Sequence, residues 1–134
     1  MSHELTHDLV NNLMVAQSIT PLARAAATVD GTAVDCQTTD GPIHGLFNVG
    51  ATTGTPTSFA VTCSLVECDT AGGTYTTIAN QSSLAAIAAA GGVGFVRGVR
   101  TMRYVKTRVV IAFVAGTSPT VNVGSEVMGQ KKSY

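Results

Sequence analysis

The chain has 134 residues, which is enough for one domain with its own hydrophobic core. Its eight basic and eight acidic side chains cancel, so it lacks the basic excess typical of nucleic-acid-binding proteins. Only 12% of the residues are charged and 45% are hydrophobic, but no apolar run approaches the roughly 20 residues that span a bilayer. We therefore expect no nucleic-acid or membrane partner, and a low-charge surface that another protein covers.

The first 20 residues differ from the rest of the chain. Five apolar residues recur there at helical spacing and form one stripe: Leu5, Leu9, Val10, Leu13 and Met14. Pro21 ends this pattern. We predict an N-terminal arm or helix over residues 1–20 and a β domain over residues 21–134. So short a helix needs a surface to lie against, which is either its own domain or a neighbouring subunit.

The cellular compartment follows from the N-terminus and the cysteines. Residues 1–5 do not resemble the start of a signal peptide, so we expect synthesis in a cytoplasm. Cys36, Cys63 and Cys68 are an odd number in a reducing compartment, and we expect buried free thiols. The spacing of Cys63 and Cys68 alone does not supply the ligands of a zinc site.

From residue 25 onward, turn signals separate short β-like runs. Residues 27–34 predict a hairpin around Asp30-Gly31, because this pair supplies the positive φ angles of a tight turn. The Gly- and Thr-rich stretch 50–57 predicts a loop. Alternation of apolar and polar residues then predicts strands with one buried face over 58–65, 105–113 and 121–127.

Residues 82–90 predict the one internal helix. Serines begin this segment, alanines fill it, and Gly91-Gly92 follows it. Leu84 and Ile87 provide its apolar contact edge. Together with the strands, this pattern predicts a mainly β protein, an antiparallel β-sandwich or barrel with one short internal helix.

The sequence offers no constellation for catalysis. No serine lies in a G-x-S-x-G elbow, and the glycines at 91–94 do not have the spacing of a phosphate-binding loop. His3 and His7 have the spacing of helical metal ligands but lack a third ligand nearby. The aspartates lie in or near turns, where they commonly cap backbone groups. We therefore expect no enzyme activity, no cofactor and no metal.

Most of the positive charge lies in a single stretch, at Arg97, Arg100, Arg103, Lys106 and Arg108. These side chains either contact carboxylates on a partner protein or are solvated charges that discourage unwanted sheet pairing. On an extended chain they point to both faces, so they need not form one patch.

Three stretches carry a family resemblance: GTAVDCQ at 31–37, VTCSLVECD at 61–69 with GTY at 73–75, and RYVK at 103–106 with GTSP at 116–119. They resemble the capsid decoration, or cement, proteins of tailed bacteriophages. The resemblance covers most of the chain after residue 5, but Cys36 stands where that family often has an aliphatic residue.

This resemblance implies a jelly-roll-like β-sandwich that binds the outside of the capsid and clamps neighbouring major capsid protein subunits. It implies a homo-oligomer, a dimer or trimer, and it supplies no catalytic residues. The expected interface residues are the apolar stripe and the arginines: Leu5, Leu9, Val10, Leu13, Met14, Arg97, Arg100, Arg103 and Arg108. The alternatives are another virion component, such as a head–tail connector or tail protein, and a glycan- or receptor-binding module. A sugar site usually shows aromatic platforms, and here Trp is absent.

Overall fold

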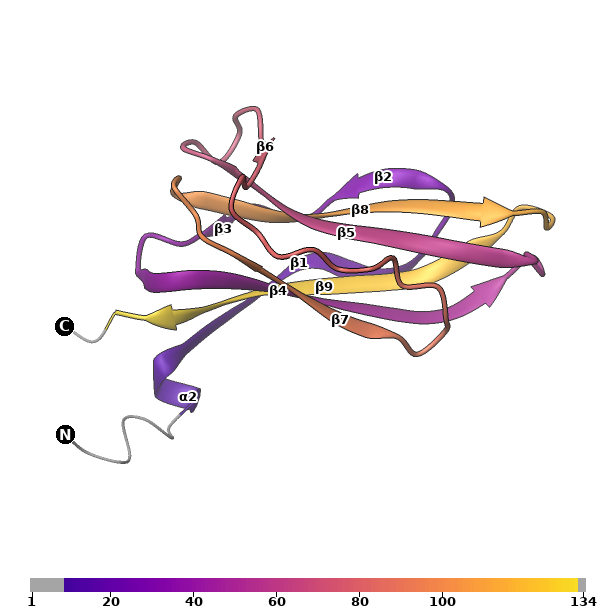
Figure 1. The fold of residues 1–134 in the computed structure, drawn as a ribbon, viewed down its shortest axis with the longest axis horizontal. Coiled ribbons are helices and arrows are strands. Elements are labelled where there is room, and N and C mark those ends of the chain that lie inside the picture. The colour runs from indigo at the N-terminus through magenta and orange to yellow at the C-terminus, as the bar shows by residue number, and fades with distance from the viewer. Residues whose placement is uncertain (1–8, 133–134) are drawn as a thin grey trace.

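Two antiparallel sheets face each other across a common core (Figure 1). The computed structural model describes the backbone of residues 9–132 and the side chains from residue 11 onward. A single helical turn, α2 (Leu9–Asn12), precedes the strands. The strands are β1 (Leu13–Arg24), β2 (Ala27–Asp30), β3 (Val34–Asp35), β4 (Thr39–Thr53), β5 (Ser58–Cys68), β6 (Thr76–Thr77), β7 (Val93–Gly98), β8 (Tyr104–Val114) and β9 (Thr120–Lys131).

The order of the strands identifies the topology. Sheet A has the order β1-β9-β4-β7, and sheet B has the order β2-β8-β5-β6 with β3 also on β8. The pairs are nested along the chain: β1 with β9, β2 and β3 with β8, β4 with β7, and β5 with β6. A long hairpin folded over a core gives this arrangement, which is a jelly roll. The expected jelly-roll-like β-sandwich is therefore confirmed.

The core lies between the sheets because the strands alternate as the sequence predicts. On β5, Val61, Cys63 and Leu65 are buried, and on β8 Val105, Val109 and Ile111 are buried. Residues from sheet A complete the core: Ile19, Ile43, Phe47, Val49, Val96, Val121, Val123 and Val127. Removing these side chains from water is the main stabilising contribution to the fold.

The predicted N-terminal helix is wrong beyond Asn12. Residues 13–24 form β1, which pairs with the last strand, so the expected boundary at residue 20 falls inside a strand of the sandwich. Leu13 and Met14 continue a helical apolar pattern in sequence, but pairing with β9 fixes them in extended backbone. Hydrogen bonds to a long neighbouring strand outweigh the weak preference of a short isolated helix.

The predicted hairpin at Asp30-Gly31 is also wrong. β2 and β3 do not pair with each other, because both lie along β8 in succession. Gly31 passes closest to Ser18, where a Cβ atom would lie 2.1 Å from the Ser18 Oγ. The glycine therefore allows a close approach to β1 rather than a tight turn. The predicted loop at 50–57 is shorter than expected, since β4 continues to Thr53.

The predicted helix at 82–90 is absent, and an extended segment takes its place. Residues 78–92, here called the closing segment, run between β5 of sheet B and β7 of sheet A (Figure 1). Ile87 exchanges backbone hydrogen bonds with Val61 of β5, at 3.0 and 2.9 Å. Ser82 donates its N–H to the carbonyl of Arg97 in β7, at 2.8 Å. The segment thus satisfies backbone groups on the edges of both sheets.

Candidate interaction surfaces

The described part of the chain contains no group of three or more His, Cys, Asp and Glu side chains arranged to hold a metal ion. None of its helices has the length and hydropathy needed to cross a membrane. His3 and His7 lie outside the described residues, and His44 lies on the outer face of sheet A, opposite Arg97 of β7.

A cluster of buried hydroxyl groups joins the two sheets inside the core. Thr107 of β8 donates its N–H to the Ser18 Oγ at 3.2 Å, and its hydroxyl bonds to that of Ser125 in β9. Ser125 also accepts the N–H of Ile19 at 3.1 Å. Together these hydroxyl groups link β1, β8 and β9, and each of them has a hydrogen-bond partner. The cluster is therefore structural.

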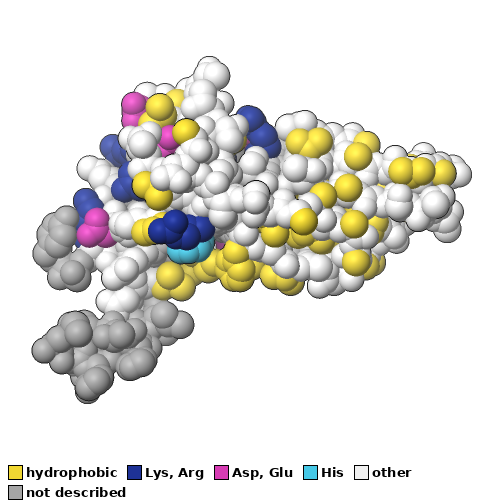
Figure 2. All heavy atoms as spheres, in the orientation of Figure 1, with side chains coloured by type: hydrophobic (Ala, Val, Ile, Leu, Met, Phe, Trp, Pro, Cys, Tyr) yellow, Lys and Arg dark blue, Asp and Glu magenta, His cyan; other side chains and the backbone are white. Residues whose placement is uncertain are grey.

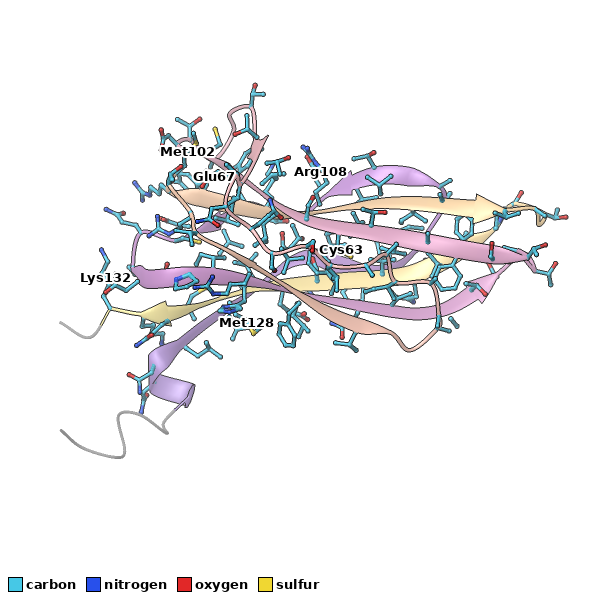
Figure 3. All side chains as sticks on the ribbon, in the orientation of Figure 1. Cys63, Glu67, Met102, Arg108, Met128 and Lys132 are labelled. Carbon is cyan, nitrogen blue, oxygen red and sulfur yellow. The ribbon has the colours of Figure 1, made fainter. Side chains whose placement is uncertain are left out.

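A second polar network holds the connection between β7 and β8 (Figure 3). The carboxylate of Glu67 is almost completely buried and accepts the N–H of Thr101 at 2.8 Å, the Thr101 hydroxyl at 2.8 Å and the N–H of Met102 at 3.2 Å. A buried carboxylate needs such donors. Glu67 therefore fixes this loop, although it lies inside one of the three stretches that carry the family resemblance.

Arg103 and Arg108 are both paired within the chain. Arg103 makes a two-point contact with Asp35, with N–O distances of 3.0 and 2.8 Å, and Arg108 makes one with Asp30 at 2.6 and 2.9 Å. The hydrogen bonds from Arg103 lower the pKa of Asp35 to about 2, and the hydrogen bond from Arg108 lowers the pKa of Asp30. These guanidinium groups already have the carboxylate partners that bidentate recognition requires.

The remaining two arginines have different environments. Arg100 donates to three backbone carbonyls, those of Cys36 at 2.6 Å, Met102 at 3.0 Å and Thr39 at 3.2 Å. Arg97 is exposed on the outer face of β7. The four arginines therefore do not form one patch. Neither Arg97 nor Arg100 makes an ion pair with the described residues, and the Arg100 guanidinium is bound by backbone carbonyls.

The N-terminal apolar stripe is divided by the fold. Leu5 lies outside the described residues, and Leu9 and Val10 belong to α2, where their side chains are not described. Met14 packs against the core. Leu13 is its neighbour on the same strand and so lies on the opposite, outer face of sheet A.

The outer face of sheet A carries side chains that the sequence-based interpretation missed. Strand register places them in two rows, Val15–Met128–His44–Arg97 and Gln17–Glu126–Leu46–Phe95, with Asn48 and Val93 beyond. Val15 is 56% exposed, Phe95 54% and Val93 61%. In Figure 2 hydrophobic side chains line the lower side of the molecule next to a histidine and a basic side chain. The missed signal is the alternation at 93–98, where large residues occupy the outer face and two glycines flank the single valine on the inner face.

The outer face of sheet B carries no charged residue in the rows that follow Arg108 along β8, from Val110 to Val114. Its rows are Thr28–Val110–Thr62, Ala112–Ala60 and Val114–Ser58. Val110 is 43% exposed and Val114 58%, and the other side chains in these rows are small. The result is a surface of methyl and hydroxyl groups.

The three stretches with the family resemblance meet in sheet B. Asp35 of β3 lies opposite Tyr104 of β8, which lies opposite Cys68 of β5. The ion pair between Arg103 and Asp35 connects the first and third stretches. No protein-family model, curated protein or solved structure matches this chain.

Proposed function

We propose that this chain is a structural, non-enzymatic virion protein of a tailed bacteriophage. In this proposal it is made in the bacterial cytoplasm, binds the outer surface of the capsid and clamps neighbouring major capsid protein subunits. The observation that carries the proposal is the convergence of the three decoration-protein-like stretches on adjacent strands of one jelly-roll sheet. The chain needs no metal, cofactor or active site for this role.

The physical task of such a protein is to resist the outward pressure of packaged DNA. A clamp resists by burying surface across the joints between subunits, and an interface of about 1,600 Å² is an ordinary size for a stable complex. Many copies on one shell act together, so that modest individual contacts suffice.

We propose the uncharged part of the outer face of sheet B, from Val110 to Val114 on β8 and the strands beside it, as the surface that contacts the capsid. Val110 and Val114 project from β8 among threonine, serine and alanine side chains, so covering this face costs little desolvation of polar groups. A surface without charged groups suits contact with a shell composed of repeated subunits.

The test is co-sedimentation of the purified protein with phage heads that lack decoration protein, followed by counting the bound copies. We expect saturation at one copy or more per equivalent position of the icosahedral shell, and heads that withstand heating better once covered. Binding confined to a single vertex would instead indicate a connector or tail protein, and no binding would contradict the proposal.

Two variants locate the contact. Val110→Lys places a charge at the centre of the sheet B face and is expected to weaken head binding at least tenfold. Ala88→Lys places the same charge on an exposed position of the closing segment and is expected to bind as the wild type does. Equal binding by both variants would exclude the sheet B face.

A further inference from the structure

The outer face of sheet A carries one cation, Arg97, and two anions, Glu126 and Asp40, that form no ion pair with the described residues. Ion pairs among residues 9–132 join Arg103 to Asp35 and Arg108 to Asp30, and neither includes Arg97 or Glu126. Glu126 accepts a hydrogen bond from the Asn48 amide at 3.2 Å. Arg97 and Glu126 stand among exposed apolar side chains, whereas Asp40 lies towards one end of the face, in the row of Leu13 and Gln130.

Strand register fixes where Arg97 and Glu126 lie relative to each other. Arg97 on β7 is in the row of His44, and Glu126 on β9 is in the row of Leu46. β4 lies between β7 and β9 in the sheet. The midpoint between Arg97 and Glu126 is therefore on β4, between His44 and Leu46, at the centre of the exposed face.

This placement makes the face complementary to itself. A two-fold axis lying in the plane of the interface and crossing β4 between His44 and Leu46 brings Arg97 of one copy opposite Glu126 of the other. Because a two-fold contact is reciprocal, the same operation makes the second ion pair. It also brings Leu46 and Phe95 of each copy against those of its partner, where apolar contact adds to the two ion pairs.

We infer that the outer face of sheet A is the interface between two copies of this chain, related by a two-fold axis over β4. Four strands about 4.8 Å apart and rows about 6.8 Å apart give a flat patch on the order of 400 Å² per copy. The two copies together would bury roughly 800 Å², which is below the size of specific stable interfaces and fits a weak, transient contact. The dimer is therefore weak and reversible. Interfaces of twice this total area extend to micromolar dissociation constants, so we expect one on the order of 10 micromolar.

The experiment is sedimentation velocity on the full-length chain over a range of concentrations. Each chain has a mass of 13.7 kDa, and the wild type is expected to shift from monomer to a species of twice that mass. Arg97→Glu and Glu126→Arg each place like charges opposite each other in a symmetric dimer, so each variant alone is expected to remain monomeric. Lys132→Glu makes the same change of charge as Arg97→Glu on an exposed residue away from the face and is expected to dimerise normally.

Mixing the two variants is the decisive step. In a mixed dimer, the carboxylate introduced at position 97 of one copy faces the guanidinium introduced at position 126 of the other. The second copy keeps its native Arg97, which faces the native Glu126 of the first, so both ion pairs are attractive again. We therefore expect the equimolar mixture of Arg97→Glu and Glu126→Arg to recover the dimer. Circular dichroism on each variant confirms that the exposed substitutions leave the fold intact.

Several results would overturn the inference: a wild type that stays monomeric up to about 100 times the expected dissociation constant, variants that dimerise as the wild type does, or a mixture that stays monomeric. If monomeric protein bound heads through this face, so that Phe95→Ser abolished head binding, the occupant would be the capsid and not a second copy. The inference does not depend on capsid binding, because a dimer without head binding would refute the proposed function alone.

Discussion

At the scale of single residues, the three thiols differ in their surroundings. Burial raises the pKa of Cys36 to about 11 and that of Cys63 to about 12, and both side chains lie in the core. Cys68 is only partly buried and lies at the end of β5, with its sulfur 3.7 Å from the Thr70 hydroxyl. Thiol reactivity requires both the thiolate form and access, and Cys36 and Cys63 lack both.

We therefore predict that a thiol reagent labels Cys68 alone in the folded protein at neutral pH. Quantitative labelling with Ellman's reagent should give one rapid equivalent per chain and three in denaturant. Cys68→Ser should remove the rapid equivalent, whereas Cys36→Ser should keep it. Rapid reaction of Cys63 in the native state would contradict the packing described above.

At the scale of elements, the closing segment shows how tertiary hydrogen bonds override local preference. The side-chain amide of Gln81 imitates a neighbouring strand: its oxygen accepts the N–H of Leu65 at 3.1 Å and its nitrogen donates to the carbonyl of Leu65 at 3.0 Å. The same nitrogen also donates to the carbonyl of Ile78 at 2.7 Å. One side chain thus satisfies both backbone groups of a core residue on the edge of β5.

We predict that Gln81→Ala destabilises the protein by about 1–3 kcal/mol, because it leaves the backbone N–H of Leu65 without its partner in a partly buried place. The Leu65 carbonyl keeps the N–H of Ile78, at 3.1 Å. Ser83→Ala is the matched control, since Ser83 is exposed in the same segment, and it should change stability by less than about 0.5 kcal/mol. Urea unfolding followed by circular dichroism measures both. A loss from Ser83→Ala as large as that from Gln81→Ala would mean that the segment is held in another way.

The same segment explains why its structure could not be predicted from its sequence. Alanine exceeds other ordinary residues in helix propensity by at most about 0.7 kcal/mol each. Unpaired groups on two sheet edges cost more, but the edges become visible only once the partners of β5 and β7 are known. The strands at 58–65, 105–113 and 121–127 were predictable because one buried face imposes alternation directly on the sequence.

The candidate surfaces were less predictable for a related reason. Arg103 and Arg108 are ordinary strand cations in sequence, and their carboxylate partners lie 68 and 78 residues away. The outer face of sheet A combines β1, β9, β4 and β7, so its rows follow only from the register. Met14 and Leu13 show the converse case, in which a helical pattern in sequence is divided between two faces by a strand.

At the scale of the whole molecule, the two sheets fit together because small residues of one sheet lie opposite large residues of the other. Gly45 on the inner face of β4 leaves room for Leu65 of β5, which crosses from sheet B: a Cβ atom on Gly45 would lie 2.9 Å from the Leu65 Cδ2 and 3.0 Å from the Phe47 ring. Neither neighbour has free space, since both are fully buried. Close packing of this kind transmits a small change at one site to both layers.

We predict that Gly45→Ala destabilises the fold by about 1–3 kcal/mol although it adds a single methyl group, because overpacking displaces Leu65 or Phe47. Shortening the opposing side chain should relieve the clash, so the double variant Gly45→Ala/Leu65→Val should be more stable than the sum of the two single changes predicts. Gly72→Ala is the matched control, since a Cβ atom there meets nothing within 4 Å, and it should be close to neutral. A double variant that is merely additive in thermal and urea unfolding would show that Gly45 and Leu65 do not share this space, and that the sheets are held apart by other contacts.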